Sequence, residues 1–289
     1  MATATNKISQ VEKKETDRLK ILERIDEFEK NQWWSKDVED DPPTVPLTAD
    51  KVDYLNKKLI NKLLTYFVNQ KAWKFILQLI KNKQLIIKEI KGIENFEKVA
   101  DKGLIITCNH FNAFDNFALH YAFYPYLKTR LYKVIREGNY TSFPGFYGLL
   151  FRHCRTLPLS SNYSCLKLFL SAIDTLLKRG EKILVYPEQG MWWNYRKPRP
   201  MASGAFKFAV TSNAPILPVF ITMTDSDLVD NDGFPIQEYT INILEPIYPD
   251  EKLSAKENME YLKNKNYEMW KATYEDFYKI PLTYLNSDE

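Results

Sequence analysis

Residues 103 to 115, G-L-I-I-T-C-N-H-F-N-A-F-D, decide the fold class of this chain. The first six of them form a mostly apolar and β-branched run, which is typical of a strand covered on both faces. After Asp115, aromatic and alanine residues recur at helical spacing, and His110 lies in the connection between the two elements. A strand that leads through a short connection into a helix is the unit of an α/β sheet, and ligands in such sheets gather at the carboxyl ends of the strands. The sequence therefore places His110 where an α/β protein carries its chemistry.

The alternation of strand and helix continues on both sides of this stretch. The predicted strands cover residues 85–90, 104–108, 131–135, 183–186, 216–221 and 239–244. One predicted helix begins after Asp115, and three more cover residues 162–178, 203–213 and 256–279. Such alternation predicts an α/β fold with a mixed, mostly parallel sheet flanked by helices, closed by an antiparallel strand.

The composition divides the chain into three parts. Residues 1–48 hold a charged helix, predicted over 8–34, and an acidic linker, 37–46, whose prolines end that helix. The apolar stripe of this helix comprises Ile8, Val11, Leu22, Ile25 and Phe28. Residues 49–83 are predicted to form an N-terminal amphipathic two-helix platform that faces a membrane, and residues 84–289 to form the α/β domain.

The predicted platform is both basic and amphipathic. Residues 51–91 carry ten lysines against two acidic residues, and apolar residues recur at helical spacing on either side of Gln70. The apolar positions are Val52, Leu55, Leu59, Leu63 and Phe67 in the first helix and Trp73, Phe75, Ile76, Leu79 and Ile80 in the second. Two interpretations stay open. The helices pack on the core with their lysines in solvent, or they lie on an anionic membrane surface, which suits lysines opposite apolar and aromatic side chains.

The composition argues against several classes of protein. No apolar run approaches the roughly 18 to 20 residues that span a bilayer, and the polar N-terminus does not resemble a secretory signal. The three cysteines are odd in number and lack metal-ligand spacing, which favours a reducing cytosol and predicts no metal site. The acidic N-terminal part and the apolar helical stripe argue against nucleic-acid binding through the basic stretch.

His110 and Asp115 stand five residues apart in the connection. A carboxylate that holds one ring nitrogen of a histidine fixes its tautomer and stabilises the imidazolium, so the other nitrogen can take a proton from a hydroxyl. The other two histidines, His120 and His153, have proline at the same offset. The sequence does not indicate a serine hydrolase, because it contains no G-x-S-x-G nucleophile elbow.

The block N-H-F-N-A-F-D, 109–115, resembles the H-x4-D block of the glycerolipid acyltransferase superfamily, whose lysophosphatidate-type members make phosphatidic acid. Three further blocks follow in the order of that family. V-Y-P-E-Q-G at 185–190 is similar to its third block, F-P-E-G-T. S-G-A-F-K-F-A at 203–209 is similar to its K-G-A-F stretch, and P-I-L-P-V at 215–219 is similar to its proline-flanked strand. The resemblance covers about residues 85–222.

The resemblance implies an enzyme that moves a fatty acyl group from a thioester donor to a hydroxyl of a lyso-glycerolipid, with 1-acylglycerol 3-phosphate as one acceptor. The donor would be acyl-CoA or acyl carrier protein. His110 would be the general base and Asp115 would orient it, with no covalent enzyme intermediate, metal or bound cofactor. Such an enzyme would be cytoplasmic and peripheral on the inner face of the cell membrane, with a lyso-lipid, an acyl thioester and an anionic membrane surface as its partners.

The same resemblance implies a set of substrate-binding residues. Asn109 lies in the first block, Glu188 and Gly190 lie in the third, and Arg136 stands near a basic position that the family uses around the acceptor phosphate. Each charged residue also has a simpler interpretation. Glu188 would bind nearby loop amides at a strand end, and Arg136 would form a solvated pair with Glu137.

The chain departs from the family after Gly190, where Met-Trp-Trp replaces the usual Thr-Arg. The expected phosphate-binding arginine is therefore missing. Arg196, Lys197 and Arg199 could replace it as phosphate ligands, because a guanidinium binds phosphate wherever the chain places it. Arg155 is a further candidate; it lies in C-R-T-L-P-L-S-S, 154–161, which resembles the family's second block only loosely, with this arginine displaced from the expected place. The departure leaves a glycolipid or another lyso-lipid as alternative acceptors, and a non-catalytic lipid-binding protein as an alternative function. The nearby aromatic residues either pack internally or contact lipid or sugar; they are Trp192, Trp193 and Tyr195.

Overall fold

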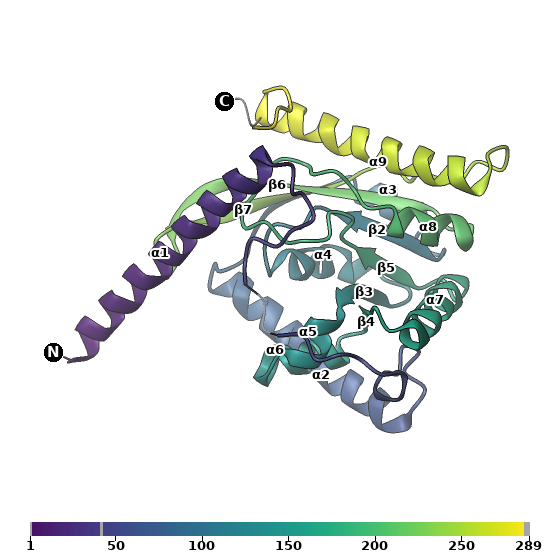
Figure 1. Ribbon diagram of the computed structural model, residues 1–289, viewed down its shortest axis with the longest axis horizontal. Coiled ribbons are helices and arrows are strands. Elements are labelled where there is room, and N and C mark those ends of the chain that lie inside the picture. The colour runs from purple at the N-terminus through teal and green to yellow at the C-terminus, as the bar shows by residue number, and fades with distance from the viewer. Residues whose placement is uncertain (1, 41–42, 286–289) are drawn as a thin grey trace.

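A seven-stranded sheet with the order β1-β7-β6-β2-β5-β3-β4 forms the centre of the computed structural model (Figure 1). The structure describes residues 2–40 and 43–285, although within α1 it describes side chains only at position 14 and from position 16 onward. The strands are β1 (Ile86–Lys91), β2 (Leu104–Cys108), β3 (Leu131–Arg136), β4 (Thr156–Leu159), β5 (Lys182–Val185), β6 (Ile216–Val229) and β7 (Pro235–Ile243). β6 and β7 pair antiparallel and the other neighbours pair parallel, which confirms the mixed, mostly parallel sheet.

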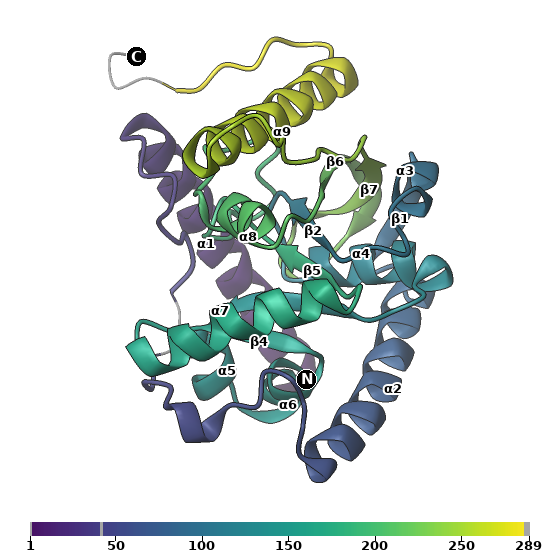
Figure 2. The same cartoon turned by 90° about the vertical axis from the view of Figure 1, so that its right-hand side faces the viewer.

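Helices cover both faces of the sheet, as the sequence predicts. They are α1 (Ala2–Lys30), α2 (Leu59–Lys81), α3 (Ile93–Glu97), α4 (Asp115–Phe123), α5 (Glu137–Ser142), α6 (Gly145–His153), α7 (Tyr163–Lys178), α8 (Gly204–Thr211) and α9 (Ala255–Tyr278), with short 3-10 turns η1 (Ala49–Lys51) and η2 (Tyr124–Tyr126). α7, α8 and α9 lie on one face, and α2, α3 and α4 on the other. Figure 2 shows α2 along one side of the molecule and α9 across its end. The strand β4 and the short helices α3, α5 and α6 were not predicted.

The β-branched run of β2 explains why this strand lies at the centre. All five of its residues are buried. Ile106 and Cys108 enter the hydrophobic core beneath α2 to α4, and Ile105, which points the other way, enters the core beneath α7 to α9. Thr107 donates its hydroxyl hydrogen to the Asn266 side chain of α9 at 2.6 Å, so its polar group is satisfied inside the protein.

Four neighbouring strands end at the same edge of the sheet. β2, β5, β3 and β4 run parallel in that spatial order, so the residues that follow them meet there. His110 follows β2, Glu188 follows β5, and Arg136 is the last residue of β3. The predicted site residues after these strands therefore lie along one edge.

The platform differs from the prediction of two consecutive helices between residues 51 and 91. That stretch contains one helix, α2, and the residues between η1 and α2 form a turn. Asp53 caps this turn, because its carboxylate accepts hydrogen bonds from the backbone amides of Lys57 and Lys58. Around Gln70 no proline or glycine interrupts the chain, so the helix continues through the predicted break.

The N-terminal helix α1 leads into an acidic segment that crosses the carboxyl edge of the sheet (Figure 1). Within it, Val38 is fully buried and packs with Ile25 of α1 and with Trp192. Ion pairs of Arg18 with Glu39 and Arg24 with Asp40 fasten the same segment to α1. The predicted stripe residues Ile8 and Val11, and positions 41, 42 and 286–289, lie outside what the structure describes.

Candidate active site at the carboxyl end of β2

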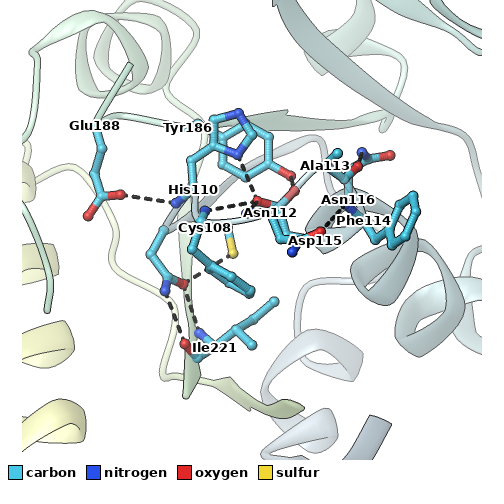
Figure 3. A network of polar contacts seen from close by, with 12 residues as sticks. Cys108, His110, Asn112, Ala113, Phe114, Asp115, Asn116, Tyr186, Glu188 and Ile221 are labelled. Atoms are coloured by element: carbon cyan, nitrogen blue, oxygen red, sulfur yellow. Dashed lines mark hydrogen bonds and ion pairs between the residues drawn. The ribbon is translucent and has the colours of Figure 1, made fainter. Parts of the chain in front are cut away.

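His110 and Asp115 form a hydrogen-bonded pair (Figure 3). The imidazole Nδ1 lies 2.7 Å from Asp115 Oδ2. The carboxylate is completely buried, whereas the histidine side chain is 22% exposed, so the imidazole is the member of the pair that a substrate reaches. With the carboxylate ionised, Nδ1 carries the proton and Nε2 remains as the basic nitrogen.

The backbone of the connection holds the carboxylate in place. Asp115 is the first residue of α4, and its Oδ2 also accepts the amides of Phe111 and Asn112 at 3.3 and 3.4 Å. The Asn112 side chain in turn accepts the amide of Phe114 at 3.0 Å, which closes a turn of the connection. A negative charge at the first turn of a helix is stabilised by the helix dipole, and these amides add further hydrogen bonds.

Tyr186 contacts both His110 and Asp115, and the sequence did not lead us to predict it as a site residue. Its ring stacks on the His110 imidazole, with centroids 4.0 Å apart and 17° between the planes. Its hydroxyl donates to Asp115 Oδ1 at 2.6 Å, so both carboxylate oxygens are engaged. Burial and the neighbouring Asp115 carboxylate raise the pKa of Tyr186 well above its ordinary value, which keeps the donor proton in place. The signal was available, because this phenol stands where the third block of the resembling family has phenylalanine.

Glu188 joins the loop after β5 to the connection that carries His110 and Asp115. Its Oε2 accepts the backbone amide of His110 at 3.0 Å and a guanidinium hydrogen of Arg199 at 2.9 Å (Figure 3 shows the first contact). Its Oε1 accepts the Arg199 amide at 2.7 Å. The Arg199 guanidinium also donates to the carbonyl oxygens of Trp34, His110 and Gly190. Both side chains of this ion pair are at most 2% exposed.

Asn109 is likewise engaged by the protein. Its side-chain oxygen accepts the Ile221 amide at 2.8 Å and its side-chain nitrogen donates to the Ile221 carbonyl at 3.0 Å. This pair of hydrogen bonds ties the end of β2 to β6 and fixes the residue that precedes His110. Asn109 itself is only 2% exposed.

The other three arginines predicted to bind substrate each pair with a residue outside the group of His110, Asp115 and Glu188. Arg136 pairs with the Asp37 carboxylate of the acidic segment, and Arg196 pairs with Asp225 of β6 at 2.7 Å. Arg155 donates to the side-chain oxygen of Asn69 on α2 at 3.1 Å. The structure thus brings His110, Asp115, Glu188, Gly190 and Arg199 into one connected cluster, with Asn109 beside it.

Residues 88–222 match the family model described as Acyltransferase. They form an Acyltransferase-family domain. The match contains the whole cluster around His110 and implies an enzyme that transfers acyl groups. A comparison with curated proteins found no match. Among solved structures, the chain is similar to the crystal structure of the 1-acyl-sn-glycerophosphate (LPA) acyltransferase PlsC from Thermotoga maritima. The identity is 20%, the coverage is 75% of this chain and 84% of that chain, and the TM-score is 0.46.

The other two histidines of the acyltransferase domain have different surroundings. His120 of α4 is largely buried, and burial lowers its pKa to about 3, so its ring stays neutral. Its Nδ1 is buried without a hydrogen-bond partner among the described residues. Burial also lowers the pKa of His153. The carboxylate partner of His110 is what sets this histidine apart from them.

The aromatic residues after Gly190 pack inside the protein. Trp192 is fully buried, stacks against Trp34 at 5.8 Å, and donates its indole hydrogen to the Lys36 carbonyl at 2.8 Å. Trp193 is 6% exposed and contacts the ring of Phe234. The acyltransferase domain thus uses this cluster to seat the acidic segment, which is the packing interpretation of the two left open by the sequence.

Proposed function

We propose that this protein transfers a fatty acyl group from a thioester donor to a hydroxyl of a lyso-glycerolipid, with His110 as the general base. The observation that carries the proposal is the His110–Asp115 contact of 2.7 Å within a domain that matches the Acyltransferase family. The order of sequence blocks after His110, which resembles that of glycerolipid acyltransferases, supports the lipid acceptor.

The chemistry requires one proton transfer at each end of the reaction. Nε2 of His110 takes the proton of the acceptor hydroxyl while Asp115 stabilises the imidazolium that forms. The acceptor oxygen attacks the thioester carbonyl, and collapse of the tetrahedral intermediate breaks the carbon–sulfur bond. The released thiolate takes the proton from the imidazolium, which returns His110 to its neutral form and leaves an ester and a free thiol.

The exposed apolar face of α2 supports a peripheral position on the inner face of the cell membrane. The face consists of Leu59, Ile60, Leu63, Leu64, Tyr66 and Phe67, which are 37 to 73% exposed. In the second half of the same helix, Ile76 and Leu79 are buried against the protein. No described helix has the length and hydrophobicity needed to cross a bilayer. The lysines of the region add attraction to an anionic leaflet of about 1 kcal/mol each.

The activity is tested by incubating the purified protein with a panel of lyso-lipid acceptors and either acyl-CoA or acyl carrier protein loaded with the same chain. Mass spectrometry of the products reports acylation. Formation of a diacyl product with wild-type protein and its loss in His110→Ala is the expected result. If lipid binds but no acceptor is acylated with either donor, the protein is a lipid-binding member of the fold and the proposed reaction is wrong.

The membrane position is tested by sedimentation with vesicles that contain anionic lipid. Binding should decrease with added salt without vanishing, because salt screens the lysines but leaves the apolar contribution of about 25 cal/mol per Å² in place. The variant Leu63→Glu with Phe67→Glu should lose the salt-resistant binding and keep its melting temperature. Leu228→Glu with Val229→Glu, an exposed apolar pair at the far end of β6, is the matched control. Unchanged salt-resistant binding in the α2 variant would contradict the proposal.

A further inference from the structure

Arg136 is the candidate acceptor arginine that points to the chemistry of the head group. It is the last residue of β3, and β3 lies two strands from β2 in the sheet, a separation of about 10 Å. The Arg136 side chain is 51% exposed, whereas Arg199 is buried and fully used by Glu188 and the carbonyl oxygens around it. Among the predicted arginines, Arg136 therefore combines an exposed side chain with a position at the carboxyl edge of the sheet that also carries His110.

A carboxylate of the protein already occupies Arg136. Asp37 pairs with its guanidinium, although the two residues are 99 positions apart in the sequence. The carboxylate also lies close to the family's third block, since a methyl group added at Gly190 would lie 3.0 Å from Asp37 Oδ1. Asp37 thus stands between Arg136 and the loop from which the usual phosphate-binding arginine is missing.

Asp37 is held in this position from both sides. The preceding carbonyl, that of Lys36, accepts the Trp192 indole hydrogen, and the following residue, Val38, is fully buried. The Val38 carbonyl accepts a hydrogen bond of 2.7 Å from Arg24 of α1. Because its neighbours are anchored, the carboxylate is preorganised on Arg136, and a competing anion must displace a fixed charge.

The surface beside this ion pair suits uncharged polar groups. A cavity of about 220 Å³ is lined by Arg136, Thr44 and Asn139, together with the apolar side chains of Phe143 and Leu159. Glu137, which also lines it, uses its Oε2 to accept the Leu47 amide and the Ser160 hydroxyl. With Arg136 neutralised by Asp37, the cavity offers hydroxyl and amide groups, which recognise the hydroxyls of a glycerol or a sugar.

We propose that Asp37 is a specificity-determining residue that takes the place of an acceptor's phosphate on Arg136, so that the site selects lyso-glycerolipids with an uncharged head group. This inference rests on the proposed acyl transfer to a lyso-glycerolipid. It names the acceptor class as a neutral monoacylglycerol or glycolipid, and it excludes a terminal phosphate monoester as the preferred head group.

A binding experiment tests the inference without turnover. Calorimetric titration with sn-glycerol 3-phosphate compares the full-length wild type with Asp37→Asn. Loss of the carboxylate removes an anionic partner that competes with phosphate for the guanidinium, so the Kd should decrease by about tenfold. Adding Arg136→Ala to Asp37→Asn should abolish the gain. Asp40→Asn is the matched control, because this acid of the same segment pairs with Arg24 instead. If wild type and Asp37→Asn bind sn-glycerol 3-phosphate with equal affinity and melt at the same temperature, the inference is wrong.

A turnover experiment on the same variants separates this inference from the proposed function. Wild type should acylate 1-acylglycerol more efficiently than 1-acylglycerol 3-phosphate, and Asp37→Asn should move the ratio of kcat/KM about tenfold toward the phosphate. If Arg136→Ala alone weakens use of the phosphate acceptor, phosphate already displaces Asp37 and the inference is wrong. If no variant acylates any acceptor, the proposed reaction fails, while the titration still decides the role of Asp37.

Discussion

The His110–Asp115 pair and the candidate acceptor arginines differ in how far along the chain their partners lie. His110 finds Asp115 five residues away, within one connection between β2 and α4. Arg196 pairs with Asp225, which lies 29 positions away in the sequence, and Arg136 pairs with Asp37, which lies 99 positions away. The comparison teaches that spacing in the sequence predicts a pair formed within one turn of chain, whereas it does not reveal which acids already occupy distant arginines.

The largest effect is expected at the His110–Asp115 pair. His110→Ala should decrease the rate of acyl transfer by about 10²- to 10⁴-fold, because His110 is the described histidine that pairs with a buried carboxylate. The melting temperature should stay close to that of wild type, since the imidazole is partly exposed and its backbone amide still donates to Glu188. His153→Ala, at a histidine of α6, is the control and should be fully active. A His110→Ala protein with normal turnover would remove the catalytic assignment.

A change at Arg199 should affect stability more than substrate affinity. Arg199→Met leaves the Glu188 carboxylate buried without its cation, which costs about 3 to 5 kcal/mol of the free energy of unfolding. The melting temperature should decrease by roughly 10 °C. The exposed Arg136→Met is the matched control and should change stability by less than about 1 kcal/mol.

The Arg199 effect has an internal check. Adding Glu188→Gln to Arg199→Met removes the uncompensated charge, so the double variant should recover part of the lost stability. A fully stable Arg199→Met with a raised KM for acceptor would instead favour the direct substrate role that the sequence suggested for Arg199.

Tyr186→Phe should give a smaller effect with a distinct signature. The ring still stacks on His110, but Asp115 loses one donor, so the carboxylate that orients the imidazole is held less firmly. The value of kcat/KM should therefore decrease while the melting temperature changes little. The charged and titratable groups around the pair are Tyr186, Cys108, Glu188, Arg199 and Tyr239.

The Tyr186 measurement is the profile of kcat/KM against pH for wild type and variant. At pH 7 the loss should be several-fold, well below that of His110→Ala. Because burial and Asp115 raise the pKa of Tyr186, the wild-type phenol stays protonated over the whole range measured, and its own ionisation does not enter the profile. An unchanged profile with a decreased melting temperature would assign Tyr186 a packing role alone.

The sequence predicted what depends on local pattern. The mostly parallel sheet, its antiparallel closure and the position of His110 between β2 and α4 followed from runs of apolar residues and from one spacing. The order of the strands, the short strand β4 and the single helix α2 did not follow, because they depend on contacts between distant segments. Tyr186 illustrates the limit within the site, since its partner Asp115 lies 71 residues away.

The smallest effect should come from Arg196. The sequence suggested that it binds phosphate, but in the structure it forms an exposed ion pair with Asp225. It is 41% exposed and its partner Asp225 is 58% exposed, so the pair contributes at most about 1 kcal/mol. Arg196→Ala should therefore leave the melting temperature and the KM for charged and neutral acceptors within about twofold of wild type. Parallel titration of Asp37→Asn and Arg196→Ala with acceptor sharpens the comparison, because one removes a fixed charge beside β3 and the other a solvent-screened pair on β6. A KM increase for phosphate acceptors in Arg196→Ala would place phosphate recognition at Arg196, beside β6, and would contradict the assignment of head-group selection to Arg136 and Asp37.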